Sequence, residues 1–188
     1  MTVVWKHGYE GASMSALTEA MGINPPSLYA CFGSKEGLFK AVLERYDQRR
    51  AEFMAEVLAA PTAAKVAEAF LFGVAGFAAD TGGQNPPGCL MLQGGISCGD
   101  AEIPDVLARH RAEKEAALCK RFEKAKAEGD LSLLSDPAAL ARYLAVMANG
   151  ICVQAAAGAT TEQLREVAAL ALAGWPAATS APQVAEPV

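Results

Sequence analysis

Apolar residues recur at steps of three and four along almost the whole chain, while the alternation typical of strands is nearly absent. The last such run contains Leu164, Val167, Ala168, Ala171, Leu172 and Trp175. Hydrophobic residues make up 52% of the 188 residues and aromatic residues only 7%, a composition that favours packed helices over sheets. The sequence therefore predicts an all-α fold.

Breaks in this periodicity divide the chain into two helical modules. A helix-turn-helix module is predicted over 1–58, a larger helical module over 59–176, and a disordered tail rich in alanine, proline and serine over 177–188. Gly22 is expected to end a helix in the left-handed conformation. The predicted helices of the first module run from Ser13 to Met21, from Pro25 to Cys31 and from Ser34 to about Leu58. Those of the second run from about Ala63 to Asp80, Cys89 to Cys98, Pro104 to Glu128, Pro137 to Ala157 and Thr161 to Trp175, with Thr161 as the last N-cap.

The charge of the chain excludes a protein that coats nucleic acid broadly. The net charge is −5, and residues 1–57 carry six Lys or Arg against seven Asp or Glu. Any DNA binding therefore has to depend on local geometry and not on bulk charge.

The segment from Gly8 to Phe39 has that geometry. Two short helices joined by a tight glycine-containing turn can place the second helix in the DNA major groove. Asn24, Ser27 and Tyr29 supply hydrogen-bonding groups on the second helix. Lys35 follows Ser34 at the start of the next helix, where free backbone N–H groups already favour a phosphate.

This segment resembles the DNA-binding module of the TetR family of repressors. The matching positions are Gly8-Tyr9, Ser13, Gly22-Ile23, Leu28-Tyr29-Ala30-Cys31-Phe32 and Ser34-Lys35-Glu36-Gly37-Leu38. The resemblance implies that Tyr29 and Lys35 contact phosphates. It also implies a DNA-facing surface made by Ser13, Ser15, Asn24, Pro25, Pro26, Ser27 and Cys31. Family members carry a longer first helix and often a basic arm, whereas seven residues precede Gly8 here, so we expect a truncated first helix.

The same resemblance implies a homodimer that binds a palindromic operator with its two recognition helices roughly 34–36 Å apart. A small, apolar effector in the second module would favour another spacing and release the DNA. Candidate pocket residues are Phe70, Phe77, Cys89, His110, Phe122 and Met147. In the helix from Pro137, the bulky face is expected to fill its own subunit and the small face to meet the partner. The candidate interface comprises Ala141, Ala145, Ala148 and Cys152, with Leu164, Ala168 and Ala171 on the last helix.

The sequence also contains features of a hydrolase, of a membrane span and of a basic surface. Gly95-Ile96-Ser97-Cys98-Gly99 matches the nucleophile elbow of hydrolases, but no strand precedes it, so no catalytic residue is assigned. Residues 138–159 contain Arg142, Asn149 and Gln154, which argues against a membrane span. The cluster Arg109-His110-Arg111 with Lys114 is expected to be mostly a solvated face.

Two alternatives stay open beside a ligand-released repressor. The first is a thiol- or metal-responsive regulator, with Cys89 and Cys98 the favoured thiol pair. The second is a small-molecule-binding helical protein with weak DNA binding. We expect no cofactor, no bound metal and a cytoplasmic location, since the five cysteines form no CxxC pair and no signal peptide opens the chain.

Overall fold

A computed structural model of the chain describes residues 2–79, 86–93 and 102–176. Within these ranges every regular element is a helix, which confirms the predicted all-α fold. The helices are α1 (Thr2–Gly11), α2 (Met14–Met21), α3 (Pro25–Phe32), α4 (Lys35–Ala59), α5 (Ala63–Ala78), α6 (Leu90–Gln93), α7 (Glu102–Ala127), α8 (Pro137–Ala156) and α9 (Thr161–Ala173).

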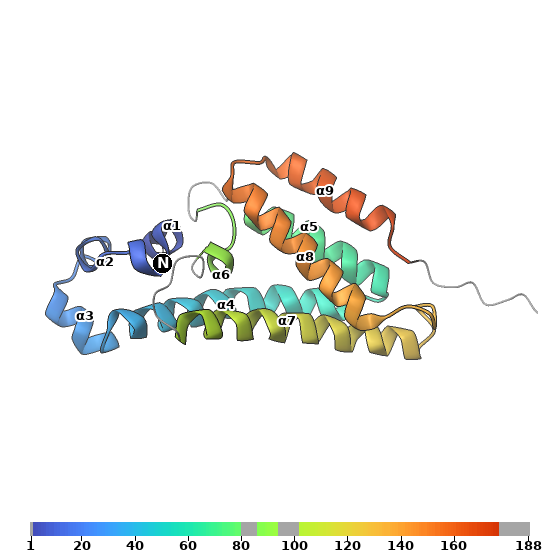
Figure 1. The fold of residues 1–188 in the computed structure, drawn as a ribbon, viewed down its shortest axis with the longest axis horizontal. Coiled ribbons are helices and arrows are strands. Elements are labelled where there is room, and N and C mark those ends of the chain that lie inside the picture. Colours follow the sequence, from blue (N-terminus) through green and yellow to red (C-terminus); the bar gives the residue numbers. More distant parts are fainter. Residues whose placement is uncertain (1, 80–85, 94–101, 177–188) are drawn as a thin grey trace, which may run out of the picture.

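The long helices α4 and α7 form the base of the molecule (Figure 1). They run in parallel, because α7 contacts the middle of α4 through Lys114 and Asp47 and its end through Arg121 and the Leu58 carbonyl. Helices α1, α2 and α3 gather at the N-terminal end of α4, and α5, α8 and α9 cover the other end. The predicted tail over 177–188 and the sequence Gly95–Gly99 lie outside the described residues.

Side-chain caps account for most of the helix starts. Ser13, Asn24, Ser34 and Thr62 each accept a hydrogen bond from the backbone N–H three residues on, and Asp136 caps α8 ahead of Pro137. One predicted cap was wrong by a residue. Thr160, not Thr161, caps α9, because its hydroxyl accepts from the Gln163 N–H while the Gln163 side chain accepts from the Thr160 N–H.

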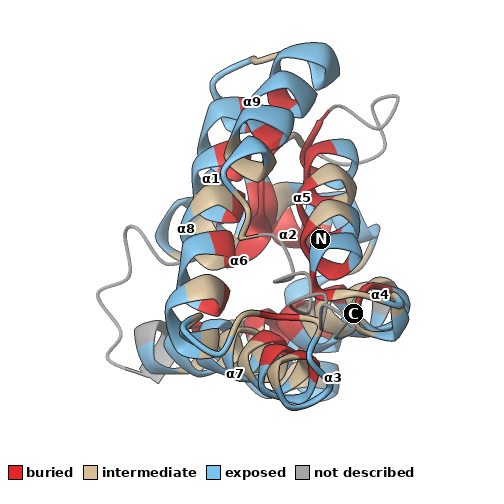
Figure 2. Ribbon diagram, turned by 90° about the vertical axis from the view of Figure 1, so that its right-hand side faces the viewer, coloured by how far each residue is buried: buried red, intermediate tan, exposed pale blue. Residues whose placement is uncertain are grey.

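Helix α5 lies at the centre of the second module, with α8 and α9 packed against it (Figure 2). Val66, Phe70, Val74 and Phe77 recur at steps of three and four along α5 and form one stripe, and the first three are buried. Phe77, the fourth member of that stripe, is 51% exposed and rests against Phe53 of α4, with the ring centroids 4.9 Å apart. The stripe is therefore buried at three of its four residues.

The expected orientation of α8 needs correction. Ala141, Ala148 and Cys152 of the small face are buried inside the subunit, together with Leu144 and Ile151 of the bulky face. Residues on these two faces are neighbours in sequence, so they lie about 100° apart around the helix. The part of the α8 surface that packs on α5 and α7 is wide enough to include residues of both the small face and the bulky face. The apolar side chains of α8 that remain exposed are Tyr143, Val146 and Val153.

The turn between α4 and α5 is fixed by α7. Arg121 donates to the carbonyl oxygens of Leu58 and Ala60, at 3.1 and 2.8 Å. Just after α7, the Asp130 carboxylate accepts from the Ala63 N–H at the start of α5. These bonds satisfy backbone groups that a helix end leaves unpaired, so the C-terminal end of α4 is held in place.

Helix α8 is also the one helix in the described ranges that is long and apolar enough to cross a membrane by length and composition. Its contacts with α5 and α7 place it as a packed helix of the bundle.

Candidate nucleic-acid interface and cavity

The turn between α2 and α3 has the geometry that the sequence predicts. Gly22 ends α2 with φ 65°, ψ 30°, the left-handed conformation, and its N–H donates to the Glu19 carbonyl. Asn24 then caps α3, whose first residues are Pro25 and Pro26. Leu28, on the inner side of α3, is fully buried. Phe32, at the end of α3, also packs against the core, so these two side chains fix the short helix on the module and most of its other residues are exposed.

The residues expected to face DNA lie at the surface of α3 and at the start of α2. Those with exposed positions are Ser13, Ser15, Asn24, Pro25, Pro26, Ser27, Tyr29 and Cys31. Two of them already have a structural role, since the Ser13 and Asn24 side-chain oxygens accept from Ala16 N and Ser27 N. The Asn24 amide group can therefore still donate to a base, while its oxygen is engaged in the cap.

Lys35 is the first residue of α4 and lies at the junction with α1. Its Nζ donates to the Glu10 carbonyl at 3.4 Å and lies 4.8 Å from the centre of the Tyr9 ring. The Ser34 hydroxyl caps the same helix end by accepting from Gly37 N. The ammonium group is thus held beside a helix N-terminus, where both favour an anion such as a DNA phosphate.

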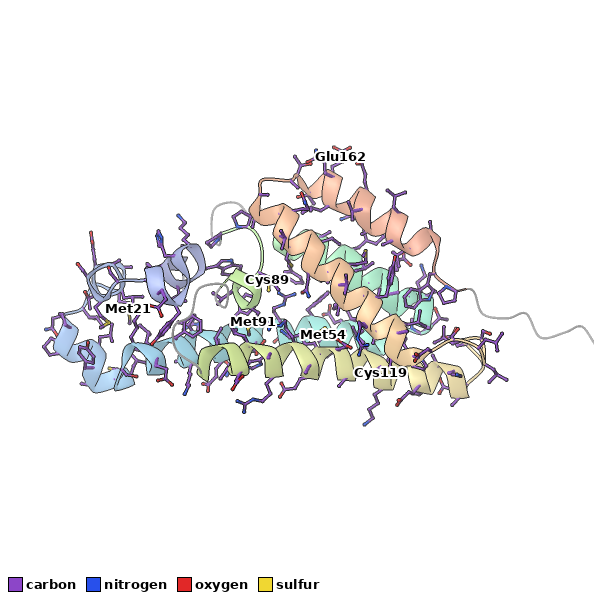
Figure 3. The ribbon with its side chains drawn as sticks, in the orientation of Figure 1. Met21, Met54, Cys89, Met91, Cys119 and Glu162 are labelled. Carbon is purple, nitrogen blue, oxygen red and sulfur yellow. The ribbon has the colours of Figure 1, made fainter. Side chains whose placement is uncertain are left out.

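A cavity of about 250 Å³ opens between α4 of the first module and α5, α7 and α8 of the second. Its apolar wall includes Met54, Phe70, Val74, Cys89 and Leu118. Figure 3 labels Met54 on α4, Met91 on α6 and Cys89 just before α6. The charged or polar lining residues are Arg50, Arg111, Lys114, Glu115, Arg142 and Asn149, and α8 adds Ala145, Val146, Ala148 and Cys152.

Of the six residues predicted to line a pocket, only two line this cavity. Phe70 and Cys89 line the cavity. Phe122 is fully buried against Trp175, and Met147 packs on the core outside the cavity lining. Phe77 rests on Phe53, as described above.

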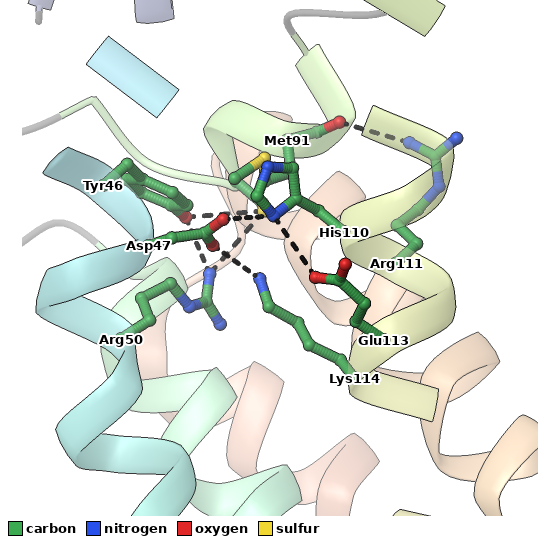
Figure 4. Close-up of polar contacts among 9 residues, drawn as sticks. Tyr46, Asp47, Arg50, Met91, His110, Arg111, Glu113 and Lys114 are labelled. Carbon is green, nitrogen blue, oxygen red and sulfur yellow. Dashed lines mark hydrogen bonds and ion pairs between the residues drawn. The ribbon is translucent and has the colours of Figure 1, made fainter. Parts of the chain in front are cut away.

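His110 binds the Asp47 carboxylate through Nδ1, beside the cavity (Figure 4). Lys114, one turn further along α7, binds the other oxygen of Asp47 at 3.1 Å. Arg111 donates to the Met91 carbonyl at 3.4 Å. The basic cluster of α7 was expected to be mostly a solvated face, but Arg111 and Lys114 line the cavity. Their spacing to the buried Leu118 is the signal that could have revealed this.

Tyr46 connects this cavity to the N-terminal module. Its hydroxyl donates to Cys89 Sγ at 3.4 Å and accepts from Arg50 Nη1 at 2.7 Å. Its ring meets Trp5 of α1 edge-on, with centroids 5.1 Å apart. Neither Tyr46 nor Arg50 was singled out from the sequence, because the contact partners are distant along the chain.

The Cys89 thiol is the more acidic member of a buried pair. The hydrogen bond with Cys152 and the nearby Arg50 guanidinium lower the pKa of Cys89 well below its usual range. The same Cys152–Cys89 hydrogen bond and burial raise the pKa of Cys152. Burial raises the pKa of Tyr46, which stays protonated as a donor. Of these two buried thiols, Cys89 is therefore the one that loses its proton more readily.

Comparison with known proteins identifies the family. The sequence profile described as "Bacterial regulatory proteins, tetR family" matches residues 1–42. The HTH-type transcriptional repressor ComR of Escherichia coli K12 is 33% identical over 94% of this chain and 85% of its own length. This chain belongs to the TetR family. It is accordingly a DNA-binding transcriptional regulator.

Solved TetR-family structures agree over nearly the full length. The regulator CifR, in a variant with two cysteines replaced and in complex with 26-bp operator DNA, superposes with a TM-score of 0.85. It is 38% identical, with 93% of this chain and 92% of CifR covered. A TetR-type regulator from Rhodococcus sp. RHA1 is 42% identical with a TM-score of 0.66, covering 94% of both chains.

Proposed function

We propose that this regulator is a repressor that binds a palindromic operator as a homodimer and leaves it when a small molecule occupies the cavity. The similar proteins ComR of E. coli and CifR support the first part, one named as a repressor and the other solved on double-strand operator DNA. In this proposal residues 1–58 bind DNA. Residues 59–176 bind the partner subunit and, together with Arg50 and Met54 of α4, the effector.

The observation that carries the release step is the position of Tyr46. It hydrogen-bonds two residues of the cavity wall, Cys89 and Arg50, and supports Trp5 of α1. A ligand that touches Cys89 or Arg50 changes the surroundings of a side chain on which the DNA-binding module rests. Such a ligand can shift the equilibrium only if it binds one arrangement of α1 and α4 more tightly than the other.

The proposed dimer interface is the exposed apolar surface of α8 and α9. It is made by Tyr143, Val153, Val167 and Leu170, with Val153 55% and Leu170 75% exposed. This surface replaces the one expected from the sequence, because Ala141, Ala148, Cys152, Leu164 and Ala168 are buried in their own subunit and Ala145 and Ala171 are partly buried. Two helices from each copy would form a four-helix contact about a two-fold axis.

We infer a cytoplasmic protein without catalytic activity, in keeping with membership in a family of transcriptional regulators. The operator experiment also tests the alternative of a small-molecule-binding protein with weak DNA binding. Purified protein is mixed with a palindromic fragment from beside its own gene in a gel shift at physiological salt. We expect one complex with two subunits per palindrome, lost when either half-site is scrambled. No specific shift, or a complex unaffected by scrambling one half-site, would contradict the proposal.

A thiol-responsive regulator is the second candidate, favoured by the acidic Cys89 beside Arg50 in the cavity. The CifR variant solved with operator DNA has cysteines replaced. Cys98, expected as the partner of Cys89, lies outside the described residues. The part of the chain that is described contains no group of three or more His, Cys, Asp or Glu placed to hold a metal ion.

N-ethylmaleimide distinguishes this candidate, since a thiolate adds to its double bond to form a C–S bond and the carbanion takes a proton from water. Both proteins compared carry Cys31→Ser, because Cys31 is an exposed thiol among the residues expected to face DNA. If the regulator responds through Cys89, the reagent abolishes the gel shift of the protein that keeps Cys89 and spares the one with Cys89→Ser. Equal loss in both proteins would exclude Cys89 as the sensor.

A further inference from the structure

The cavity carries more positive than negative charge. Its lining contains four cationic side chains, Arg50, Arg111, Lys114 and Arg142, and one carboxylate, Glu115. Two of the cations are neutralised: Lys114 by Asp47 at 3.1 Å and Arg142 by Glu115 at 3.2 Å. Among the described residues no carboxylate pairs with Arg50 or Arg111.

Arg50 is the more buried of these two guanidinium groups, and no carboxylate balances its positive charge. Its Nη1 donates to the Tyr46 hydroxyl at 2.7 Å and to Cys89 Sγ at 3.6 Å, neither of which is a carboxylate. Asp47, the nearest acid along α4, is already bound by Lys114 and His110 from α7 (Figure 4). While the Cys89 thiol keeps its proton, Arg50 has no negatively charged neighbour in hydrogen-bonding contact. A cation withdrawn from water is costly without an opposite charge, so the site then favours an anion from solution.

The wall beyond Arg50 is apolar. Met54 lies one turn further along α4, and Phe70, Val74 and Leu118 complete that side from α5 and α7. A ligand that fills about 250 Å³ here would place its charged group at Arg50 and the rest of its surface against apolar side chains.

We propose that the cavity binds a small monocarboxylate with an apolar body, its carboxylate paired with the Arg50 guanidinium. The planar fork of N–H donors on arginine matches the two oxygens of a carboxylate. As the identity of the releasing effector, this inference rests on the proposed function. It departs from the purely apolar effector expected from the sequence, because Arg50 was not recognised there as part of the pocket.

Matched ligand pairs test the charge requirement on the full-length protein. Octanoate is compared with octan-1-ol, and phenylacetate with phenylacetamide, by titration calorimetry at pH 7.5 without DNA. We expect each carboxylate to bind at least tenfold more tightly than its neutral partner. Equal or weaker binding of both carboxylates would overturn the proposal.

Variants at Arg50 locate the site. Arg50→Gln should bind octanoate and octan-1-ol equally, whereas Arg109→Gln, which removes an exposed cation of α7, should keep the wild-type preference. A preference retained in folded Arg50→Gln would overturn the assignment. If that variant does not fold, the alkylation rate of Cys89 by iodoacetamide in the wild type is the readout. Octanoate should slow this alkylation at concentrations at which octan-1-ol does not, and equal rates would contradict contact with Arg50.

A parallel gel shift separates this inference from the proposed function. Carboxylate binding that depends on Arg50 but leaves the operator complex intact would support the ligand class and contradict ligand release. Loss of the charge preference, with specific operator binding retained, would contradict the ligand class and leave the repressor proposal standing.

Discussion

The Lys35 ammonium lies 4.8 Å from the centre of the Tyr9 ring and donates to the carbonyl of Glu10, so a residue of α4 is fastened to α1. Its position beside the capped start of α4 suits a phosphate contact. We expect Lys35→Ala to weaken operator and non-operator binding about equally and to lower the salt slope of binding by about one. Fluorescence anisotropy at several salt concentrations measures both. Lys65→Ala, which removes a cation from α5, is the control, and a loss confined to one base position would contradict a phosphate role for Lys35.

Asn24 caps α3, and we propose that its amide group also contacts a base; two substitutions separate these roles. Asn24→Ala removes both the cap of α3 and the amide donor, whereas Asn24→Ser keeps a capping oxygen. We expect only Asn24→Ala to lose stability, by about 1 kcal/mol. Both variants should change the preferred operator sequence, by about 1–3 kcal/mol at the contacted base. Selection from a randomised DNA library measures that preference, and an unchanged profile in Asn24→Ser would exclude Asn24 as a reader of sequence.

The exposed face of α8 and α9 predicts how the dimer can be separated. Val153→Glu would place an unpaired carboxylate in the proposed interface, at a cost of several kcal/mol. We expect a helical monomer by sedimentation that no longer shifts operator DNA. Leu134→Glu introduces the same charge at a side chain that is 96% exposed in the α7–α8 connection and should remain dimeric. An intact dimer for Val153→Glu would place the interface elsewhere.

Two glycines with opposite surroundings form a matched pair. A Cβ at Gly37 would lie 2.0 Å from the Phe32 carbonyl oxygen, while a Cβ at Gly76 meets no atom within 4 Å. Gly37→Ala should therefore lower the free energy of unfolding by about 1–3 kcal/mol by forcing α3 and α4 apart. Gly76→Ala lies in the last turn of α5 and should raise the free energy of unfolding by about 0.5–1 kcal/mol. Thermal and urea unfolding measure both, and a neutral Gly37→Ala would contradict the close approach of the two helices.

The acidic thiol of Cys89 predicts a pH-dependent contribution to stability. Its pKa is lower in the folded protein than the value of about 8.5 in an unfolded chain. The thiolate therefore stabilises the fold fully above the unfolded pKa, and this stabilisation is lost as the pH falls through the folded value. The stability difference between wild type and Cys89→Ser should shrink between pH 9 and pH 5. In Cys152→Ala, which removes the main hydrogen-bond donor to Cys89, the decrease should move to higher pH. A difference independent of pH would show that no thiolate forms.

The elements near the DNA could be predicted because their signals are local. A cap, a left-handed glycine and a proline at a helix start each act within four residues, so Ser13, Gly22 and Pro25 can be interpreted without knowledge of the fold. The orientation of α8 could not be predicted in this way. Its two apolar faces adjoin, and only the positions of α5 and α7 decide that Ala148 points inward and Val153 outward.

Which residues line the cavity could not be predicted from the sequence for a similar reason. Arg50 and Cys89 are 39 residues apart, and Cys152 joins them from a third element. The family resemblance made Phe77 and Phe122 pocket candidates, yet one rests on the surface beside Phe53 and the other packs on Trp175. Helical spacing identifies which residues face inward, but it does not distinguish a packed interior from a hollow one.

The bonds from Arg121 to Leu58 and Ala60 make α4 a lever with one fixed end. At 1.5 Å per residue, its 25 residues extend about 37 Å from that pivot to Lys35. A rotation of only about 3° at the fixed end would therefore displace the start of α4 by about 2 Å, with most of the helix bonds unchanged. Tyr46 and Arg50 lie between the pivot and the DNA-binding end, so a small displacement beside the cavity is magnified where the protein meets its operator.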